Sequence, residues 1–151
     1  MDWLPHNLNK GLLSRVHRSD TKVESLAQLD FFDGCSRKAL AAAARLVDFL
    51  EFEPGTVLAR AGSPAAQVLI VHRGTVEITG EGSGPAVAGR GYLFGEMEAL
   101  GHLPHSATLV ARGPVEVAVI EARDFLQLLD TLPCLALKVL QRVVRQPQKV
   151  A

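Results

Sequence analysis

The residues best suited to bind a ligand or do chemistry lie between Gly89 and Ala111, where carboxylates, imidazoles and hydroxyls share one glycine-rich segment. Two glycines free the backbone to turn, and Glu96 to Leu100 can form one helical turn before Pro104 stops it. The first amides of such a turn lack partners within it and attract an anion, while the Glu96 carboxylate can accept hydrogen bonds from hydroxyls. The segment therefore predicts a pocket for a ligand that carries phosphate and hydroxyl groups.

The same segment resembles the phosphate-binding cassette of the cyclic nucleotide-binding domain family. The family pattern is Phe-Gly-Glu, seven residues, Pro-Arg, one or two small residues and Ala-Thr; this chain has Phe94-Gly95-Glu96, seven residues, and Pro104-His105-Ser106-Ala107-Thr108. The resemblance implies that Glu96 accepts a ribose 2′-hydroxyl, that Ser106 donates from its hydroxyl, and that the amides of Gly95, Glu96 and Met97 receive the phosphate. The implied ligand-binding residues are Phe94, Gly95, Glu96, Met97, Pro104, His105, Ser106 and Ala107.

His105 departs from the family pattern because it stands where the phosphate-binding arginine belongs. Arginine is permanently charged and pairs with phosphate through two bonds, whereas histidine, with a reference pKa of about 6.5, is mostly neutral near pH 7. Losing a charge-assisted hydrogen bond costs roughly 1.5 to 3 kcal/mol, or about one to two powers of ten in affinity. The sequence thus predicts weakened binding of 3′,5′-cyclic AMP or a related ligand. Glu98, a second carboxylate on the turn, is expected to face solvent.

The composition is typical of one domain whose overall charge attracts neither nucleic acid nor an acidic membrane. The chain has 151 residues and a formal net charge of zero, so binding to nucleic acid or an acidic membrane would need a local patch. Cys35 and Cys134 lie far apart without metal-ligand spacing and are expected to be core thiols of a protein in a reducing compartment. No apolar run is long enough to span a membrane and no signal-peptide core is present, so we expect a cytoplasmic protein without a membrane contact.

From Asp48 onward, hydrophobic residues alternate with period two between short turns, which is typical of strands. About eight strands with tight turns favour a mainly β fold with flanking helices, an antiparallel jelly-roll or double-stranded β-helix. The turn sequences Pro54–Gly62 and Ile70–Gly74 also resemble the family, so the resemblance covers residues 26–145. Seven of the strands are expected at Phe49–Phe52, Thr56–Arg60, Gln67–His72, Val76–Thr79, Ala86–Ala88, Ser106–Ala111 and Val115–Glu121.

Helices are expected on both sides of this roll. Residues 1–25 have loosely helical spacing and are interpreted as an N-terminal helical extension, and Ser36 is a suitable N-cap for a helix over Arg37–Val47. After the roll, two amphipathic helices meet at Pro133, and residues 146–151 form a tail. The resemblance implies that the last helix closes over the ligand, pairs with its copy in a dimer, and signals to an effector, here a separate protein.

Three other functions are compatible with parts of this sequence. A cupin-type enzyme would share the roll, but His102, His105, Glu96 and Glu98 lack the His-x-His spacing of its metal site, so we expect no catalysis, metal or cofactor. Four cations and no acids after Thr131 could contact DNA, but a solvated helix face explains such a count more simply. The alternative to a ligand sensor is a ligand-free interaction or dimerisation module that kept the β-roll.

Overall fold

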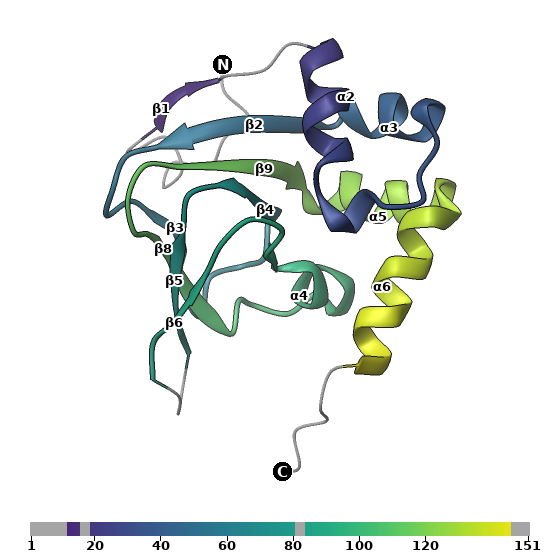
Figure 1. The fold of residues 1–151 in the computed structure, drawn as a ribbon. Coiled ribbons are helices and arrows are strands. Elements are labelled where there is room, and N and C mark those ends of the chain that lie inside the picture. The colour runs from purple at the N-terminus through teal and green to yellow at the C-terminus, as the bar shows by residue number, and fades with distance from the viewer. Residues whose placement is uncertain (1–11, 16–18, 81–83, 146–151) are drawn as a thin grey trace.

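Two antiparallel sheets form the body of the protein (Figure 1). A computed structural model describes residues 12–15, 19–80 and 84–145, and all strand positions below refer to these residues. The five-stranded sheet has the order β1-β2-β9-β4-β7, with β1 at Leu12–Arg15, β2 at Val47–Phe52, β9 at Val115–Glu121, β4 at Gln67–Arg73 and β7 at Leu93–Phe94. The four-stranded sheet has the order β3-β8-β5-β6, with β3 at Val57–Ala59, β8 at Ala107–Ala111, β5 at Val76–Gly80 and β6 at Ala86–Ala88. The expected mainly β roll is confirmed.

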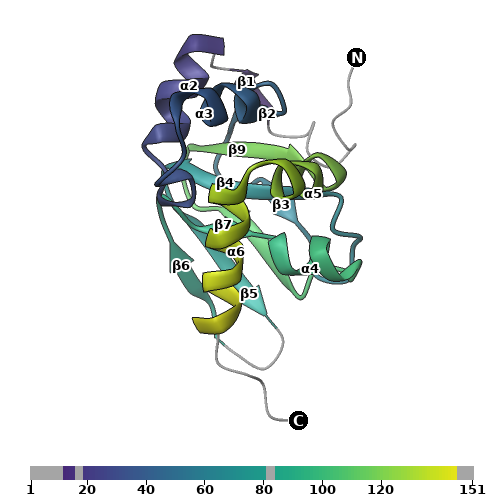
Figure 2. The ribbon, with the colours of Figure 1, turned by 90° about the vertical axis from the view of Figure 1, so that its right-hand side faces the viewer.

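Helices cover one side of the five-stranded sheet (Figures 1 and 2). They are α2 at Ser19–Ala27, the short 3₁₀ helix η1 at Asp30–Phe32, α3 at Arg37–Ala44, α5 at Ala122–Thr131 and α6 at Pro133–Arg145. A further helix, α4 at Glu96–Gly101, belongs to the cassette and lies beside the lower part of the roll. Within the described ranges, no helix combines the length and apolar character needed to cross a membrane.

The five-stranded sheet separates two hydrophobic cores, which explains the nearly unbroken apolar sequence of β4. Val68 and Ile70 face the core that the helices cover, while Leu69 and Val71 face the core between the two sheets. All four side chains are at most 2 % exposed, because alternate residues of a strand point to opposite faces and both faces are covered here. The cassette follows β7, the neighbour of β4, so a rigid strand positions it.

Several local predictions are confirmed by the backbone. The Ser36 hydroxyl accepts a hydrogen bond from the Ala39 amide at 3.1 Å and caps α3. The helix ends at Ala44 rather than at Val47, because Val47 opens β2 and is buried in the helix-covered core. The break between the last two helices falls at Leu132, directly before Pro133. The expected tail, residues 146–151, lies outside the described residues.

The helical interpretation of residues 1–25 is wrong for Leu12–Arg15, which form β1 and pair antiparallel with β2. A four-residue segment has little intrinsic preference, and the open edge of β2 supplies backbone partners that an isolated helical turn would lack. The helical interpretation holds from Ser19, where α2 begins, and residues 1–11 and 16–18 lie outside the description. The domain limits at residues 25 and 145 stay predictions.

The cysteine prediction is also wrong. Cys35 and Cys134 form a disulfide with their Cα atoms 5.4 Å apart, although 99 positions separate them in the sequence. The fold brings the loop before α3 against the start of α6, which no spacing rule could reveal. The expectation of a reducing compartment rested on unpaired thiols and so loses that support.

Candidate functional site

The cassette joins β7 to β8 through a sharp turn and one short helix. Gly95 has φ 91° and caps α4, which begins at Glu96, so the expected helical turn is confirmed. A Cβ atom on Gly95 would lie 3.0 Å from the Gln67 carbonyl oxygen and 3.2 Å from the His105 ring, so both conformation and space require glycine here. Because α4 starts at once after this glycine, its first amides have no partner within the helix.

Glu96 is buried, with 4 % of its surface exposed, and it pairs with an arginine from the last helix. Arg142 of α6 donates from Nε at 2.9 Å and from its terminal nitrogen at 2.8 Å, both to Oε2 of Glu96. A buried carboxylate needs such compensation. A carboxylate has room for further hydrogen bonds, so Glu96 can accept from a hydroxyl while it holds Arg142. The pair therefore connects the predicted ribose acceptor directly to α6.

His105 packs inside the cassette. Its ring lies 5.1 Å from the ring of Phe94, only 7 % of the residue is exposed, and Nδ1 is buried without a hydrogen-bond partner. The backbone is fixed on both sides, because its amide donates to Ser63 O and its carbonyl accepts from the Gly62 amide, each at 2.8 Å. Burial lowers the pKa of His105, although the charge of Glu98 acts in the opposite direction. The imidazole is therefore neutral near pH 7.

Ser106 and Glu98 interact with each other. The exposed Ser106 hydroxyl donates to Oε2 of Glu98 at 3.1 Å. This bond uses the hydroxyl proton that the resemblance assigned to a ligand, so a ligand acceptor would have to compete with Glu98. Glu98 is half-buried and its carboxylate contacts Ser106, where the sequence indicated a side chain facing solvent.

Comparison with known proteins identifies the family. The sequence profile of the cyclic nucleotide-binding domain matches residues 49–132, which is more than half of the chain. The chain belongs to the cyclic nucleotide-binding domain family. The match includes β7, α4 and β8, so the cassette described above lies within the family domain.

Relatives of this cyclic nucleotide-binding domain occur in several kinds of protein. Acetyltransferase Pat of Mycolicibacterium smegmatis is 33 % identical over 119 residues, which cover 76 % of this chain and 35 % of the enzyme. A putative potassium channel protein of Rhodopseudomonas palustris is 29 % identical over 136 residues, covering 85 % of this chain and 32 % of that protein. The chain thus spans about a third of these curated relatives.

Solved structures agree on the fold. A cAMP-binding acyltransferase from Mycobacterium smegmatis matches with TM-score 0.63 and 32 % identity, covering 84 % of this chain and 39 % of that one. A regulatory subunit of a cAMP-independent protein kinase A from Trypanosoma cruzi, bound to guanosine, matches with TM-score 0.74 and 27 % identity over 85 % of this chain and 47 % of that one. A cyclic nucleotide-binding domain from Methylobacillus flagellatus, 24 % identical with TM-score 0.72, covers 94 % and 87 % of the two chains and supports the fold alone.

The domain brings most of the predicted site residues together. Phe94, Gly95, Glu96 and Met97 follow one another at the β7–α4 turn, and His105 returns to contact Phe94 and Gly95. The flanking residues differ in exposure, since Ala107 is 9 % exposed while Pro104 and Ser106 lie at the surface. The role of each residue toward a ligand stays a prediction.

Sequence reasoning missed two members of this cluster. Arg142 was counted only as one of several helix cations, and its contact with Glu96 crosses 46 positions of sequence. Tyr92 lies beside Phe94, with ring centroids 6.3 Å apart; burial, and after it the charge of Glu96, raises the pKa of its hydroxyl. A neutral tyrosine can donate a hydrogen bond, and its position two residues before Phe94 on the same segment was the only available signal.

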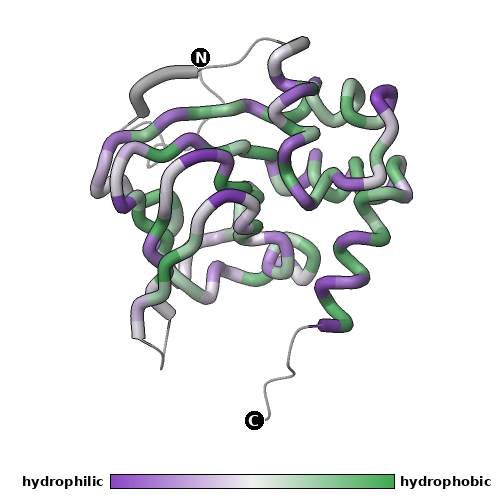
Figure 3. The backbone as a smooth tube through the Cα atoms, in the orientation of Figure 1, coloured by the Kyte–Doolittle hydropathy of each residue, from purple (hydrophilic) through white to green (hydrophobic). Residues whose placement is uncertain are grey.

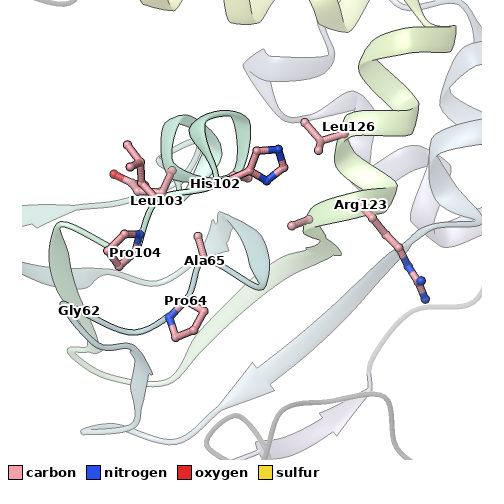
Figure 4. Close-up of a pocket in the computed structure, with 11 residues that line it drawn as sticks. Gly62, Pro64, Ala65, His102, Leu103, Pro104, Arg123 and Leu126 are labelled. Atoms are coloured by element: carbon pink, nitrogen blue, oxygen red, sulfur yellow. The ribbon is translucent and has the colours of Figure 1, made fainter.

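A separate pocket of about 490 Å³ lies between α4 and α5 (Figure 4). Figure 4 shows the His102 ring between α4 and Leu126 of α5, with Pro64 and Pro104 along the opposite wall. Of the predicted site residues, only Pro104 lines this pocket, so it differs from the cassette turn. Among the residues that the structure describes, no group of three or more acidic, histidine or cysteine side chains could hold a metal ion.

Proposed function

We propose that this domain is a non-catalytic sensor of a 3′,5′-cyclic nucleotide of the cAMP type, and that His105 lowers its affinity. The observation that carries the proposal is the cassette itself: a family turn in which a buried glutamate begins α4 and a histidine follows the proline. The M. smegmatis relative is described as cAMP-binding, and it shares 32 % identity with this chain. A sensor of this kind needs no resident cofactor.

The burial of His105 explains the lowered affinity. A neutral imidazole offers one donor and no charge to a phosphate, where an arginine would offer a charged fork. Burial lowers the pKa of His105, so its charge is gained only below its usual titration range. A bound phosphate would favour the charged form, and we therefore expect affinity to rise as the pH falls below about 6.5.

The Glu96–Arg142 pair supplies the route for the signal. A ribose hydroxyl on Glu96 would change the environment of a carboxylate that already holds α6 through Arg142. Ligand binding can then shift α6 only to the extent that the two positions of the helix bind ligand differently. We expect α6 to pass this change to a separate effector protein in a signalling role.

A nucleoside is the second candidate ligand, because His105 gives the pocket no permanent positive charge. Ribose recognition through Glu96 does not require a phosphate, and the T. cruzi relative is described as bound to guanosine and as cAMP-independent. A neutral ligand also avoids the repulsion that Glu98 would exert on a phosphate.

Calorimetry with cyclic AMP, adenosine and guanosine tests these proposals on the wild type and on His105→Arg. Cyclic AMP should bind His105→Arg at least about tenfold more tightly than the wild type, because a charge-assisted bond is regained. Leu103→Arg, which adds the same charge at a 58 % exposed site of the same loop, is the control and should leave affinity nearly unchanged. Nucleoside binding with the same affinity in the wild type and in His105→Arg would favour the second candidate. If neither protein binds any of the three ligands, the ligand-free interaction module is the supported function.

We also propose that the outer face of α6 pairs with a second copy of the chain. Leu137, Leu140, Val143 and Val144 are between 49 % and 77 % exposed and lie along this face, while Leu135 and Val139 are buried on the inner face. Figure 3 shows hydrophobic and hydrophilic positions alternating along the helix. Leu140→Glu should abolish any dimer seen by sedimentation, whereas Gln127→Glu, on the exposed side of α5, should not; a monomeric wild type would refute the proposal.

The predictions of no membrane contact, no DNA binding and a cytoplasmic location remain expectations of the same proposal. Of the cations counted after Thr131, Arg142 already pairs with the carboxylate of Glu96. Lys138 and Arg145 remain on α6, and a titration with duplex DNA at two salt concentrations would test whether they bind phosphates.

A further inference from the structure

The last helix is attached to the rest of the domain at three levels. Near its start, Cys134 is joined to Cys35 by a disulfide. In its middle, Leu135 and Val139 are 0 % and 6 % exposed in the helix-covered core. Near its end, Arg142 pairs with Glu96. Only the first of these attachments is a covalent bond, so it is the one that chemistry can make or break.

The disulfide lies next to the break between α5 and α6. Leu132 has an extended backbone, with φ −120° and ψ 98°, and separates α5 from α6. Cys134 is the second residue of α6, and its partner Cys35 lies between Gly34 and the N-cap Ser36 of α3. Figure 2 shows α3 above α5 and the start of α6. The bond therefore links the first turn of α6 to the segment that leads into α3, one of the helices that cover the sheet.

Solvent can reach this bond. A cavity of about 400 Å³ is lined by Cys134 together with Gly34, Ser36 and Lys38, and both cysteines are only partly buried. A small thiol fits such a space. Lys38 also lines this cavity, and a cation near a thiol favours the thiolate form through which thiol–disulfide exchange proceeds.

We propose that Cys35 and Cys134 form a reversible thiol–disulfide site that determines how firmly α6 is attached to the domain. A reducing dithiol attacks Cys134 Sγ as a thiolate, which breaks the Sγ–Sγ bond and releases Cys35 as a thiolate. The second thiolate of the reductant then displaces Cys134, so the reductant leaves as a disulfide and the protein gains two electrons and two protons. An oxidised dithiol reverses both steps. In the reduced state, the attachments of α6 that remain among the described residues are its buried apolar side chains and the Glu96–Arg142 pair.

Hydrogen exchange of the full chain, with and without dithiothreitol and in the absence of nucleotide, tests the proposal. Reduction should speed exchange of the α6 amides by about tenfold or more while the amides of β4, which is buried on both faces, stay unchanged. The double variant Cys35→Ser/Cys134→Ser should exchange like the reduced wild type with or without reductant. Equal exchange of α6 in the oxidised and reduced wild type would overturn the proposal, even if the double variant failed to fold.

Alkylation followed by mass spectrometry provides the second measurement. Protein purified without reductant should carry no alkyl groups on Cys35 and Cys134, and dithiothreitol should open both to alkylation without any denaturant. Alkylation of untreated protein, or reduction only after unfolding in denaturant, would show that the pair is not a reversible site. Because neither measurement uses a nucleotide, their outcome is independent of the proposed ligand.

Discussion

Replacing Arg142 by methionine should destabilise the domain because it leaves the buried carboxylate of Glu96 without its partner. Methionine keeps much of the arginine volume and removes only the charged head. The Glu96 side chain is 5 % exposed and that of Arg142 is 39 % exposed. Breaking a fully buried pair costs roughly 3–5 kcal/mol, and the partial exposure of Arg142 reduces this, so we expect about 2–3 kcal/mol. For a domain of this size that loss lowers Tm by roughly 4–12 °C.

Thermal unfolding of four proteins provides the assay: wild type, Arg142→Met, Glu96→Gln and the double variant. The double variant should be more stable than Arg142→Met alone, because it no longer buries an unpaired charge. Arg145→Met, which removes an exposed arginine three residues later on α6, is the control and should change Tm little. If Arg142→Met and Arg145→Met lower Tm equally, or if the double variant is additive within about 0.5 kcal/mol, the pair does not attach α6 as described.

Three further perturbations follow from the geometry. Gly74→Ala should lower the free energy of unfolding, measured in urea, by more than about 1 kcal/mol, because Gly74 has φ 85° and an added Cβ would lie 2.4 Å from the Pro114 carbonyl oxygen. Gly55→Ala is the control: Gly55 has φ 83° but open space around it, so this variant measures the conformational part of the loss alone. Acid should destabilise the domain, because burial lowers the pKa of both His72 and His105 in the folded protein. The stabilisation that these neutral imidazoles give above a pH of about 6.5 is then lost as the pH falls. A Tm that stays constant from about pH 7.5 to 5 would contradict this. Ser36→Ala removes the α3 cap and should cost about 1 kcal/mol, with Ser36→Asp restoring most of it; equal stability of all three would rule out the cap.

Local chemistry made much of the cassette readable from the sequence. A glycine with positive φ before Glu96 and a proline eight residues later restrict the backbone to a turn and one short helix, whatever surrounds them. The continuous apolar run of β4 is likewise typical of a strand buried on both faces, because only covered faces favour apolar residues at every position. The presence of histidine instead of arginine at 105 was equally visible, since it needs no structure to be seen.

Contacts that cross long stretches of sequence required the tertiary structure. The disulfide between Cys35 and Cys134 and the pair of Glu96 with Arg142 depend on where α6 lies, and no local pattern encodes that position. The strand at Leu12–Arg15 depends on the open edge of β2 in the same way. Short-range preferences act within a few residues, so the sequence alone determined the cassette turn, the strands of the roll after Asp48 and the absence of an arginine at position 105. Packing decided which distant side chains meet, because burial of apolar surface, and not spacing along the chain, selects those neighbours.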